Sequence, residues 1–296
     1  DKNRARRAYD IVTSCIRIEA GIEVNLGKTE SWGVNGGEAP IGINDLGSPE
    51  TPPIWKGNLA PNLNGIEILG TPLGSQAYIH DICRIRMQEE LKLLDRLSHG
   101  LSHQTAWLLL NYCAAPRANY MLRTLTPSAV SDYARAHDTA IRNAFARIFD
   151  LPEDISHSVP CRSRLEMPVR FGGIGLQSAD RIAPSAYWSS WADSLSTLNK
   201  RVPGFRNFFL GSMAGVAVLS PNHADCLQQL HRSALQLLSI EGARVPTWQE
   251  LCQGDMSPDS QEENDDGGND GSLLLMVQKA LINHGDANGA DMQLWQ

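Results

Sequence analysis

Apolar residues recur every three or four positions through most of the stretch from residue 76 to residue 200, and this periodicity restricts the fold more than any other feature. Such spacing places apolar side chains on one face of an α-helix, where they can pack into a core. The apolar face of the first segment is interrupted only by Glu90. Its members are Ile79, Ile82, Cys83, Met87, Leu91 and Leu94. We therefore expect a long helix that begins near residue 76.

Three more helices are predicted before residue 200. Ser102 is suited to cap the second helix, which Pro116 should bend or end. Pro127 is suited to the first turn of the third helix. The spacing of Trp188 and its apolar neighbours predicts a fourth helix over residues 185–200. The same spacing favours a core position for Tyr187, Trp188 and Trp191 over a role in stacking on bases.

The first 75 residues have a different pattern, with one helix and several short extended segments. Residues 4–20 predict an amphipathic helix that ends at Gly21. Residues 27–34 predict a turn followed by a strand, and residues 65–74 predict a strand that runs into a tight turn. Residues 35–64 contain five glycines and five prolines, which predicts an irregular surface insertion. The expected fold class is therefore α+β, with a small antiparallel sheet of two to four strands before the mostly helical region.

Charge is distributed unevenly along the chain, whose formal net charge is -7. Residues 1–210 hold 23 basic and 21 acidic side chains, whereas residues 211–296 hold 3 and 12. A polyanion such as a nucleic acid could therefore bind the first part of the chain but not the last. Residues 253–272 are acidic, rich in glycine and nearly free of apolar side chains, which predicts a disordered linker. Residues 273–283 predict a short helix after it.

Cysteine spacing and hydropathy bear on the compartment. The six cysteines include no Cys-x-x-Cys pair, which favours a reducing compartment and gives no indication of structural zinc. No stretch approaches the roughly 20 apolar residues that a membrane-spanning helix requires. The first residues do not have the pattern of a signal peptide. We expect an intracellular protein, nuclear or cytoplasmic, with no membrane partner.

Three short motifs follow one another in the order that one polymerase family carries them. The first is Gly-Ile-Glu-Val-Asn-Leu-Gly-Lys-Thr-Glu at residues 21–30, and the second is Ile-Leu-Gly-Thr-Pro-Leu-Gly at residues 68–74. The third, at residues 165–178, contains Gly-Gly-Ile-Gly-Leu. Over about residues 5–200 the chain resembles the C-terminal palm and thumb portion of the reverse transcriptases of non-LTR (LINE-like) retrotransposons. In that family the first motif is the polymerase motif D, the second is the primer grip, and a helical thumb follows.

The resemblance implies roles for particular residues. Lys28 would assist the departure of pyrophosphate, because that leaving group needs a proton or a positive charge. The primer grip that would position the primer end consists of Leu69, Gly70, Thr71, Pro72, Leu73 and Gly74. Basic residues of the helical region would hold an RNA–DNA or DNA primer–template duplex by its phosphates. The candidates are Arg84, Arg86, Lys92, Arg117, Arg123, Arg135 and Arg142.

The metal-binding carboxylates of such a polymerase are missing from this chain. The family holds two metal ions, usually with two adjacent aspartates on a hairpin between apolar strands. The only adjacent aspartates here are Asp265 and Asp266, in the acidic linker. In the family the paired aspartates precede motif D and would lie upstream of Asp1. We therefore expect no metal or cofactor site in this chain, Mg²⁺ in the complete enzyme only, the missing upstream palm as a partner, and no polymerase activity from the chain alone.

The resemblance also implies four segments along the chain. Residues 1–75 would be the C-terminal part of a palm, and residues 76–200 a helical, thumb-like domain with the segment that follows the thumb. Residues 201–252 would form a partly helical extension. Residues 253–296 would comprise the acidic disordered linker and the short C-terminal helix.

Other interpretations of the same residues remain open. Lys28 can be a solvated turn lysine, and the basic residues can form an ordinary charged face that pairs with neighbouring carboxylates. The chain would then be a non-catalytic retroelement remnant, acting as a helical interaction module or without function. A metal-dependent hydrolase is a further alternative, using His99 with His103 or His137 with Asp138. Because His137 falls on the apolar face of its helix, a packed or hydrogen-bonded role is favoured for it.

Overall fold

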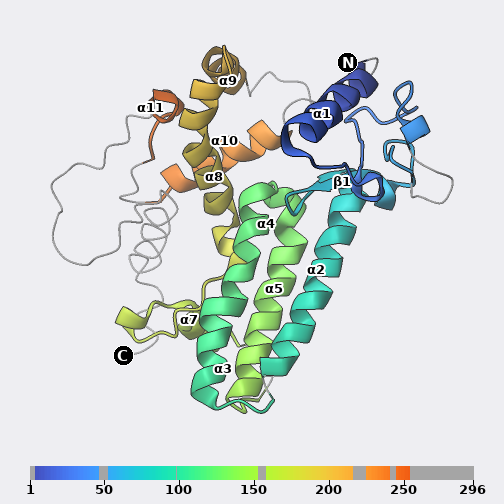
Figure 1. Ribbon diagram of the computed structural model, residues 1–296. Coiled ribbons are helices and arrows are strands. Elements are labelled where there is room, and N and C mark those ends of the chain that lie inside the picture. The colour runs from blue at the N-terminus through green and yellow to red at the C-terminus, as the bar shows by residue number, and fades with distance from the viewer. Residues whose placement is uncertain are drawn as a thin grey trace. The chain divides into compact units, whose positions relative to one another are not determined.

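The computed structural model describes residues 4–46, 53–97, 99–152, 158–215, 225–240 and 245–253. These residues are mostly helical, with one two-stranded antiparallel sheet near the N-terminus (Figure 1). The predicted α+β class is therefore confirmed. The chain divides into two compact units, Asp1–Arg86 and Met87–Gln296. The predicted acidic linker and C-terminal helix lie outside the described residues from residue 254 onward.

The first unit begins with the predicted amphipathic helix. Helix α1 covers Ala5–Ala20, and Gly21 ends it in the left-handed conformation at φ +65°. Three short 3₁₀ turns, one hairpin and the first half of helix α2 follow. Their bounds are η2 Leu26–Lys28, η3 Asn44–Leu46, η4 Pro61–Leu63, β1 Gly65–Ile68, β2 Thr71–Gly74 and α2 Gln76–Leu97.

The hairpin confirms the strand and tight turn predicted for residues 65–74. Strands β1 and β2 pair antiparallel, with Gly65 opposite Gly74 and Ile68 opposite Thr71. Both glycines are required because Tyr78 packs against them. A Cβ atom on Gly65 would lie 2.2 Å from Tyr78 Cδ1, and one on Gly74 would lie 2.5 Å from the carbonyl oxygen of Asn64.

Two predictions for the first unit are wrong. Residues 27–34 form a 3₁₀ turn and a single bridge between Ser31 and Trp55, and no strand there joins the hairpin within the described residues. Residues 35–64 are not only a surface insertion, because Ile43, Ile54 and Trp55 form the buried cluster of this unit. Trp55 is 3% exposed, and its indole Nε1 donates to the Gly37 carbonyl at 2.7 Å. Periodicity missed this cluster, because its members come from irregular chain.

The apolar face of α1 is uncovered. No residue of this helix is buried, and Ile11 and Val12 are 53% and 54% exposed. The helix is held at its first turn, where Arg6 donates to the Gly42 carbonyl at 2.6 Å. The described residues therefore leave the predicted packing face of α1 without a partner.

The second unit contains the predicted helices. Beyond the last part of α2, its elements are α3 His103–Leu109, η5 Leu110–Ala114, η6 Ala115–Arg117, α4 Ala118–Thr124, α5 Pro127–Ile148, α7 Val159–Glu166, η7 Val169–Phe171, α8 Ala179–Arg201, α9 Phe205–Ala214, α10 Asp225–Leu238 and α11 Trp248–Gln253. The last three give helix to part of residues 201–252, as the sequence predicts for that segment.

Helix α8 is the centre of this unit. It packs against the neighbouring helices α4 and α5, which lie side by side in Figure 1, and against α10 and α11. Trp188 is fully buried and Tyr187 is 4% exposed. Their rings belong to a cluster with Phe209, Leu230 and Leu251 from the helices that follow. The core role predicted for the Tyr187 and Trp188 rings is therefore confirmed.

Pro116 alters the chain without ending the helical region. Ser102 caps α3 as predicted, its Oγ accepting from the amide of Thr105 at 3.2 Å. The helix then widens into the π-helical turn η5 and tightens into the 3₁₀ turn η6 before α4 begins. A proline has no amide to donate, and its ring clashes with the carbonyl four residues earlier in a regular α-helix. A wider turn before Pro116 avoids that clash and connects α3 to α4.

No helix among the described residues has both the length and the apolar character needed to cross a bilayer.

Candidate functional site

Lys28 lies at the end of the 3₁₀ turn η2, exposed and without a hydrogen bond or ion pair from its amine to the described residues. The chain just beyond it reaches the hairpin through side chains. Trp32 Nε1 donates to Asn64 Oδ1 at 2.7 Å, immediately before β1. Burial and the nearby carboxylates of Glu30 and Glu67 raise the pKa of Tyr78, the residue that packs on the hairpin. The segment of Lys28 is thus connected to the hairpin by side chains, without the sheet that the sequence predicted.

The hairpin tip is exposed and locally strained. Leu69 and Gly70 form its two-residue loop with φ +49° and +84°. Glycine adopts this left-handed conformation at no steric penalty, whereas a residue with a Cβ loses roughly 1–2 kcal/mol. Leu69 is also 91% exposed, so it projects an apolar side chain into solvent. Arg86 fixes the tip by donating to the Gly70 carbonyl and pairing with Glu67 at 3.2 Å.

Four of the seven predicted phosphate contacts are paired with carboxylates. The pairs are Arg84–Asp81 at 2.7 Å, Arg86–Glu67 at 3.2 Å, Arg123–Asp193 at 2.9 Å and Arg135–Asp132 at 2.6 Å. Each pair is partly exposed, where such contacts contribute about 0–1 kcal/mol to stability. For these four arginines, the contacts match the alternative interpretation, a charged face that pairs with neighbouring carboxylates.

The other three predicted contacts have no carboxylate partner among the described residues. Lys92 and Arg117 are exposed and form no hydrogen bond or ion pair there. Arg142 is half-buried and donates to the hydroxyl of Thr139 at 3.1 Å, which leaves its charge uncompensated. All three lie in the second unit, on α2, η6 and α5 respectively. These three side chains contribute basic charge that is available to an anion, as do other cations of this unit that form no ion pair among the described residues, such as Arg96, Arg147 and Lys200.

Glu90 is buried in a polar network that the sequence indicated only as an interruption of an apolar face. It is 6% exposed. The Tyr133 hydroxyl donates to Glu90 Oε1, and Glu90 Oε2 lies 2.8 Å from His137 Nδ1. The other ring nitrogen, His137 Nε2, lies 3.1 Å from the Ala115 carbonyl. Both ring nitrogens of His137 thus lie within hydrogen-bond distance of oxygen atoms. The hydrogen-bonded role favoured for His137 is confirmed.

Asp138 acts as a cap for a different helix. Its carboxylate accepts from the Ser178 hydroxyl at 2.6 Å and from the backbone amides of Ala179 and Asp180 at 2.6 and 3.2 Å. These groups begin α8, where free amides and the helix dipole favour a negative charge. Glu90 and Asp138 are thus occupied in the interior and do not pair with the basic surface residues.

The histidine pairs do not form metal sites. His99 lies between α2 and α3 and its Nδ1 lies 2.8 Å from the Asp95 carbonyl, whereas His103 begins α3 and its ring packs beside Phe149. Among the described residues no group of three or more His, Cys, Asp and Glu side chains is placed to hold a metal ion. Asp265 and Asp266 lie outside that part of the chain. The resemblance places Mg²⁺ in the complete enzyme, with its carboxylates upstream of Asp1.

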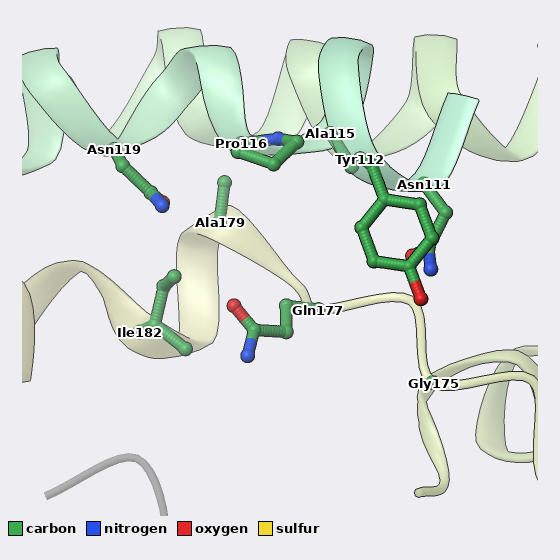
Figure 2. Close-up of a pocket in the computed structure, with 9 residues that line it drawn as sticks. All are labelled: Asn111, Tyr112, Ala115, Pro116, Asn119, Gly175, Gln177, Ala179 and Ile182. Atoms are coloured by element: carbon green, nitrogen blue, oxygen red, sulfur yellow. The ribbon is translucent and has the colours of Figure 1, made fainter. Parts of the chain in front are cut away.

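A small pocket opens where the π-helical turn faces the start of α8 (Figure 2). Its volume is about 270 Å³. Figure 2 shows Asn111, Tyr112 and Asn119 on one wall, with Gln177 on the facing segment. Nothing in the sequence indicated a site at these residues, because uncharged amides scattered over 67 positions form no motif. The one sequence signal near these residues is Pro116, which follows the wider turn η5.

Comparisons with protein-family models, with curated proteins and with solved structures gave no match to this chain.

Proposed function

We propose that this chain is the C-terminal part of an RNA-directed DNA polymerase of the non-LTR retrotransposon type, and that its helical region binds a primer–template duplex by the phosphate backbone. The observation that carries the proposal is the set of three cations without carboxylate partners, Lys92, Arg117 and Arg142. Unpaired cations bind phosphates and release the counterions condensed on the duplex, which drives association without reading sequence.

The order of elements supports the polymerase assignment. An amphipathic helix, a short loop with a lysine, a β-hairpin and a helical domain follow one another, which is the order of the resembling family. In this proposal the uncovered face of α1 packs against the upstream palm. The catalytic carboxylates and Mg²⁺ belong to that palm, so this chain contributes binding and positioning.

Two roles in the first unit belong to the same proposal. Residues 69–74 of the hairpin position the primer end. Arg86 holds the hairpin tip by donating to the Gly70 carbonyl, and a tip held in place can keep a nucleotide in position. Lys28 supplies a positive charge to the leaving pyrophosphate once the palm is present. Its amine is free for that role among the described residues. No sheet among the described residues joins its segment to the hairpin, so its position depends on the side-chain contacts near Trp32.

The proposal is tested by binding of the full chain to a short RNA–DNA duplex at several salt concentrations. The variant Lys92→Gln/Arg117→Gln/Arg142→Gln should bind more weakly. Its plot of log K against log salt should become shallower, by up to about 0.9 for each cation that contacts a phosphate.

The matched control removes three cations that already have carboxylate partners. Arg123→Gln/Arg135→Gln/Arg162→Gln changes the net charge equally, but each of these arginines pairs with Asp193, Asp132 or Glu166. We expect the control to keep most of the wild-type affinity and slope. Equal losses in both variants would mean that net charge alone matters, and a duplex affinity independent of salt would contradict the proposal.

A second candidate is a non-catalytic helical interaction module, and the uncovered apolar face of α1 favours it. Ile11, Val12 and Ile16 are 53%, 54% and 38% exposed, an arrangement typical of a helix that binds a partner protein. This candidate predicts no salt-dependent duplex binding. It predicts instead that Val12→Lys abolishes association with the partner without affecting the fold of the helical region.

A further inference from the structure

The pocket beside the π-helical turn has the composition of a site for a flat, uncharged ring with hydrogen-bonding edges. Its nine lining residues include no acidic and no basic side chain. The lining residues are Asn111, Tyr112, Ala115, Pro116, Asn119, Gly175, Gln177, Ala179 and Ile182. A pocket without charge discriminates against phosphates, carboxylates and metal ions, because each of these needs an opposite charge for desolvation.

The polar atoms of the pocket are available to a ligand. The side-chain amides of Asn111, Asn119 and Gln177 have no hydrogen-bond partner among the described residues. Each amide offers both a donor and an acceptor, and this combination matches the edge of a nucleobase. Ala115, Pro116 and Ile182 supply apolar surface beside them (Figure 2).

Tyr112 adds an aromatic face. It is 72% exposed, and Figure 2 shows its ring directed toward the segment that carries Gly175 and Gln177. Exposed aromatic rings are the usual platform for unpaired bases, since every base has a π-face that can stack. Tyr112 stands on the π-helical turn, a distortion that often accompanies binding sites.

The size of the pocket and the neighbouring charge point to one base of a single strand. A volume of about 270 Å³ lies below the roughly 300–1,000 Å³ typical of pockets for drug-sized ligands. A base in a duplex is paired and stacked, so it cannot enter. Arg117, which has no partner among the described residues, follows Pro116 directly and can meet the phosphate of a bound nucleotide.

We propose that this pocket binds one unpaired base of a single-stranded nucleic acid, with Tyr112 stacking on the base and the three amides bonding its edge. The site adds a single-strand contact to the duplex binding proposed above, and its existence does not depend on that duplex binding.

The test measures binding of short single-stranded oligonucleotides to the full chain. Tyr112→Ala should weaken binding by about 5-fold to 150-fold, because stacking contributes about 1–3 kcal/mol per base. Tyr112→Phe keeps the ring and should bind nearly as well as the wild type. Phe208→Ala is the matched control, since Phe208 is 71% exposed on α9 and lies outside the pocket. It should leave the affinity unchanged.

A strand of abasic nucleotides separates base binding from phosphate binding. The wild type should bind it at least as weakly as Tyr112→Ala binds the normal strand, because the abasic strand also loses the amide contacts. Tyr112→Ala should keep the wild-type salt dependence. Equal affinity of the wild type for normal and abasic strands would overturn the inference, as would a normal affinity for Tyr112→Ala. If duplex binding fails while Tyr112-dependent binding of single strands persists, the proposed function falls and this inference stands.

Discussion

A carboxylate in the middle of an apolar helical face destabilises a fold unless hydrogen bonds and a counter-charge satisfy it. Glu90 is satisfied by Tyr133 and His137, two residues four positions apart on α5. Residues four positions apart lie on the same face of a helix, so the Tyr133 phenol and the His137 imidazole both reach the Glu90 carboxylate. This network fixes the register of α2 against α5 within the second unit, a specificity that apolar contacts alone would not provide.

Removing that carboxylate should be far more destabilising than removing its neighbour in the sequence. Glu90→Ala leaves the Tyr133 hydroxyl and His137 Nδ1 without their partner in the interior. We expect it to lower the free energy of unfolding by about 2–4 kcal/mol. Glu89→Ala removes an exposed carboxylate one position earlier and should change that free energy by less than about 0.5 kcal/mol. Urea denaturation of both variants measures the difference, and similar values would contradict the role given to Glu90.

Cys83 provides a prediction about pH. Burial raises the pKa of its thiol to about 11. The fold therefore favours the neutral thiol, and the resulting stability is present below about pH 9 and is lost as the pH rises toward 11. At pH 8 only about one Cys83 in a thousand should be ionised. Iodoacetamide should then label the exposed Cys15 and Cys113 well before Cys83 in the folded chain, as mass spectrometry of the peptides can determine. Rapid labelling of Cys83 at pH 8 would show that its thiol is accessible and ionised.

At the scale of elements, the start of α8 depends on a residue from another helix. Asp138 on α5 accepts three hydrogen bonds from the first residues of α8, while Ser178 caps the same helix locally. A carboxylate at this position both bonds free amides and compensates the positive end of the helix dipole. The bonds join α5 to α8, so they determine where α8 begins and how it packs against α5. Helix α5 also carries Tyr133 and His137, the partners of Glu90.

We expect Asp138→Ala to lower the free energy of unfolding by about 2–3 kcal/mol, as it leaves buried donors unsatisfied. Asp138→Asn keeps an acceptor but loses the charge, so it should have an intermediate effect. The control is Asp132→Ala on the same helix, whose carboxylate is exposed and pairs with Arg135. A surface pair of this kind contributes about 0–1 kcal/mol. Thermal or urea denaturation of the three variants gives the order, and an Asp132 effect as large as that of Asp138 would contradict this account.

Sequence periodicity located the long helices α1, α2, α5 and α8 because each one follows a single rule over four or more turns. Helix α5 begins at Pro127 and α3 is capped by Ser102, as local chemistry predicts. The need for a pattern of several turns also explains why the strand predicted within residues 27–34 was wrong. Four to eight residues carry too little pattern to separate a strand from irregular chain, and the cluster around Trp55 depends on contacts between distant segments.

The candidate sites were predictable only where charge or a turn marked them. The basic residues were visible in the sequence, but which of them are paired depends on side-chain positions: Arg135 meets Asp132, whereas Arg142 meets Thr139. Glu90 and His137 were each noticeable as polar residues on apolar faces, yet their contact joins two helices 47 positions apart. The pocket amides had no signal at all, because neutral side chains show a site only when the fold brings them together.

At the scale of the whole molecule, the cations of the helical region share the chain with a strongly acidic end. Residues 211–296 carry 12 acidic and 3 basic side chains, and Glu262, Glu263, Asp265 and Asp266 are concentrated within five positions. A dense block of carboxylates attached to the same chain competes with phosphates for the unpaired cations. Under the proposed function, we expect the acidic end to set a threshold that only a polyanion of higher charge density, such as a nucleic acid, exceeds.

Replacing those four residues with their amides removes four negative charges and should strengthen duplex binding. We expect a several-fold gain at low salt that disappears as salt rises, because the Debye length falls from about 30 Å at 0.01 M to about 3 Å at 1 M. A variant with the order of residues 254–272 scrambled keeps the charge and should bind like the wild type. If the amide variant binds no more tightly at low salt, the acidic block does not compete for Lys92, Arg117 and Arg142.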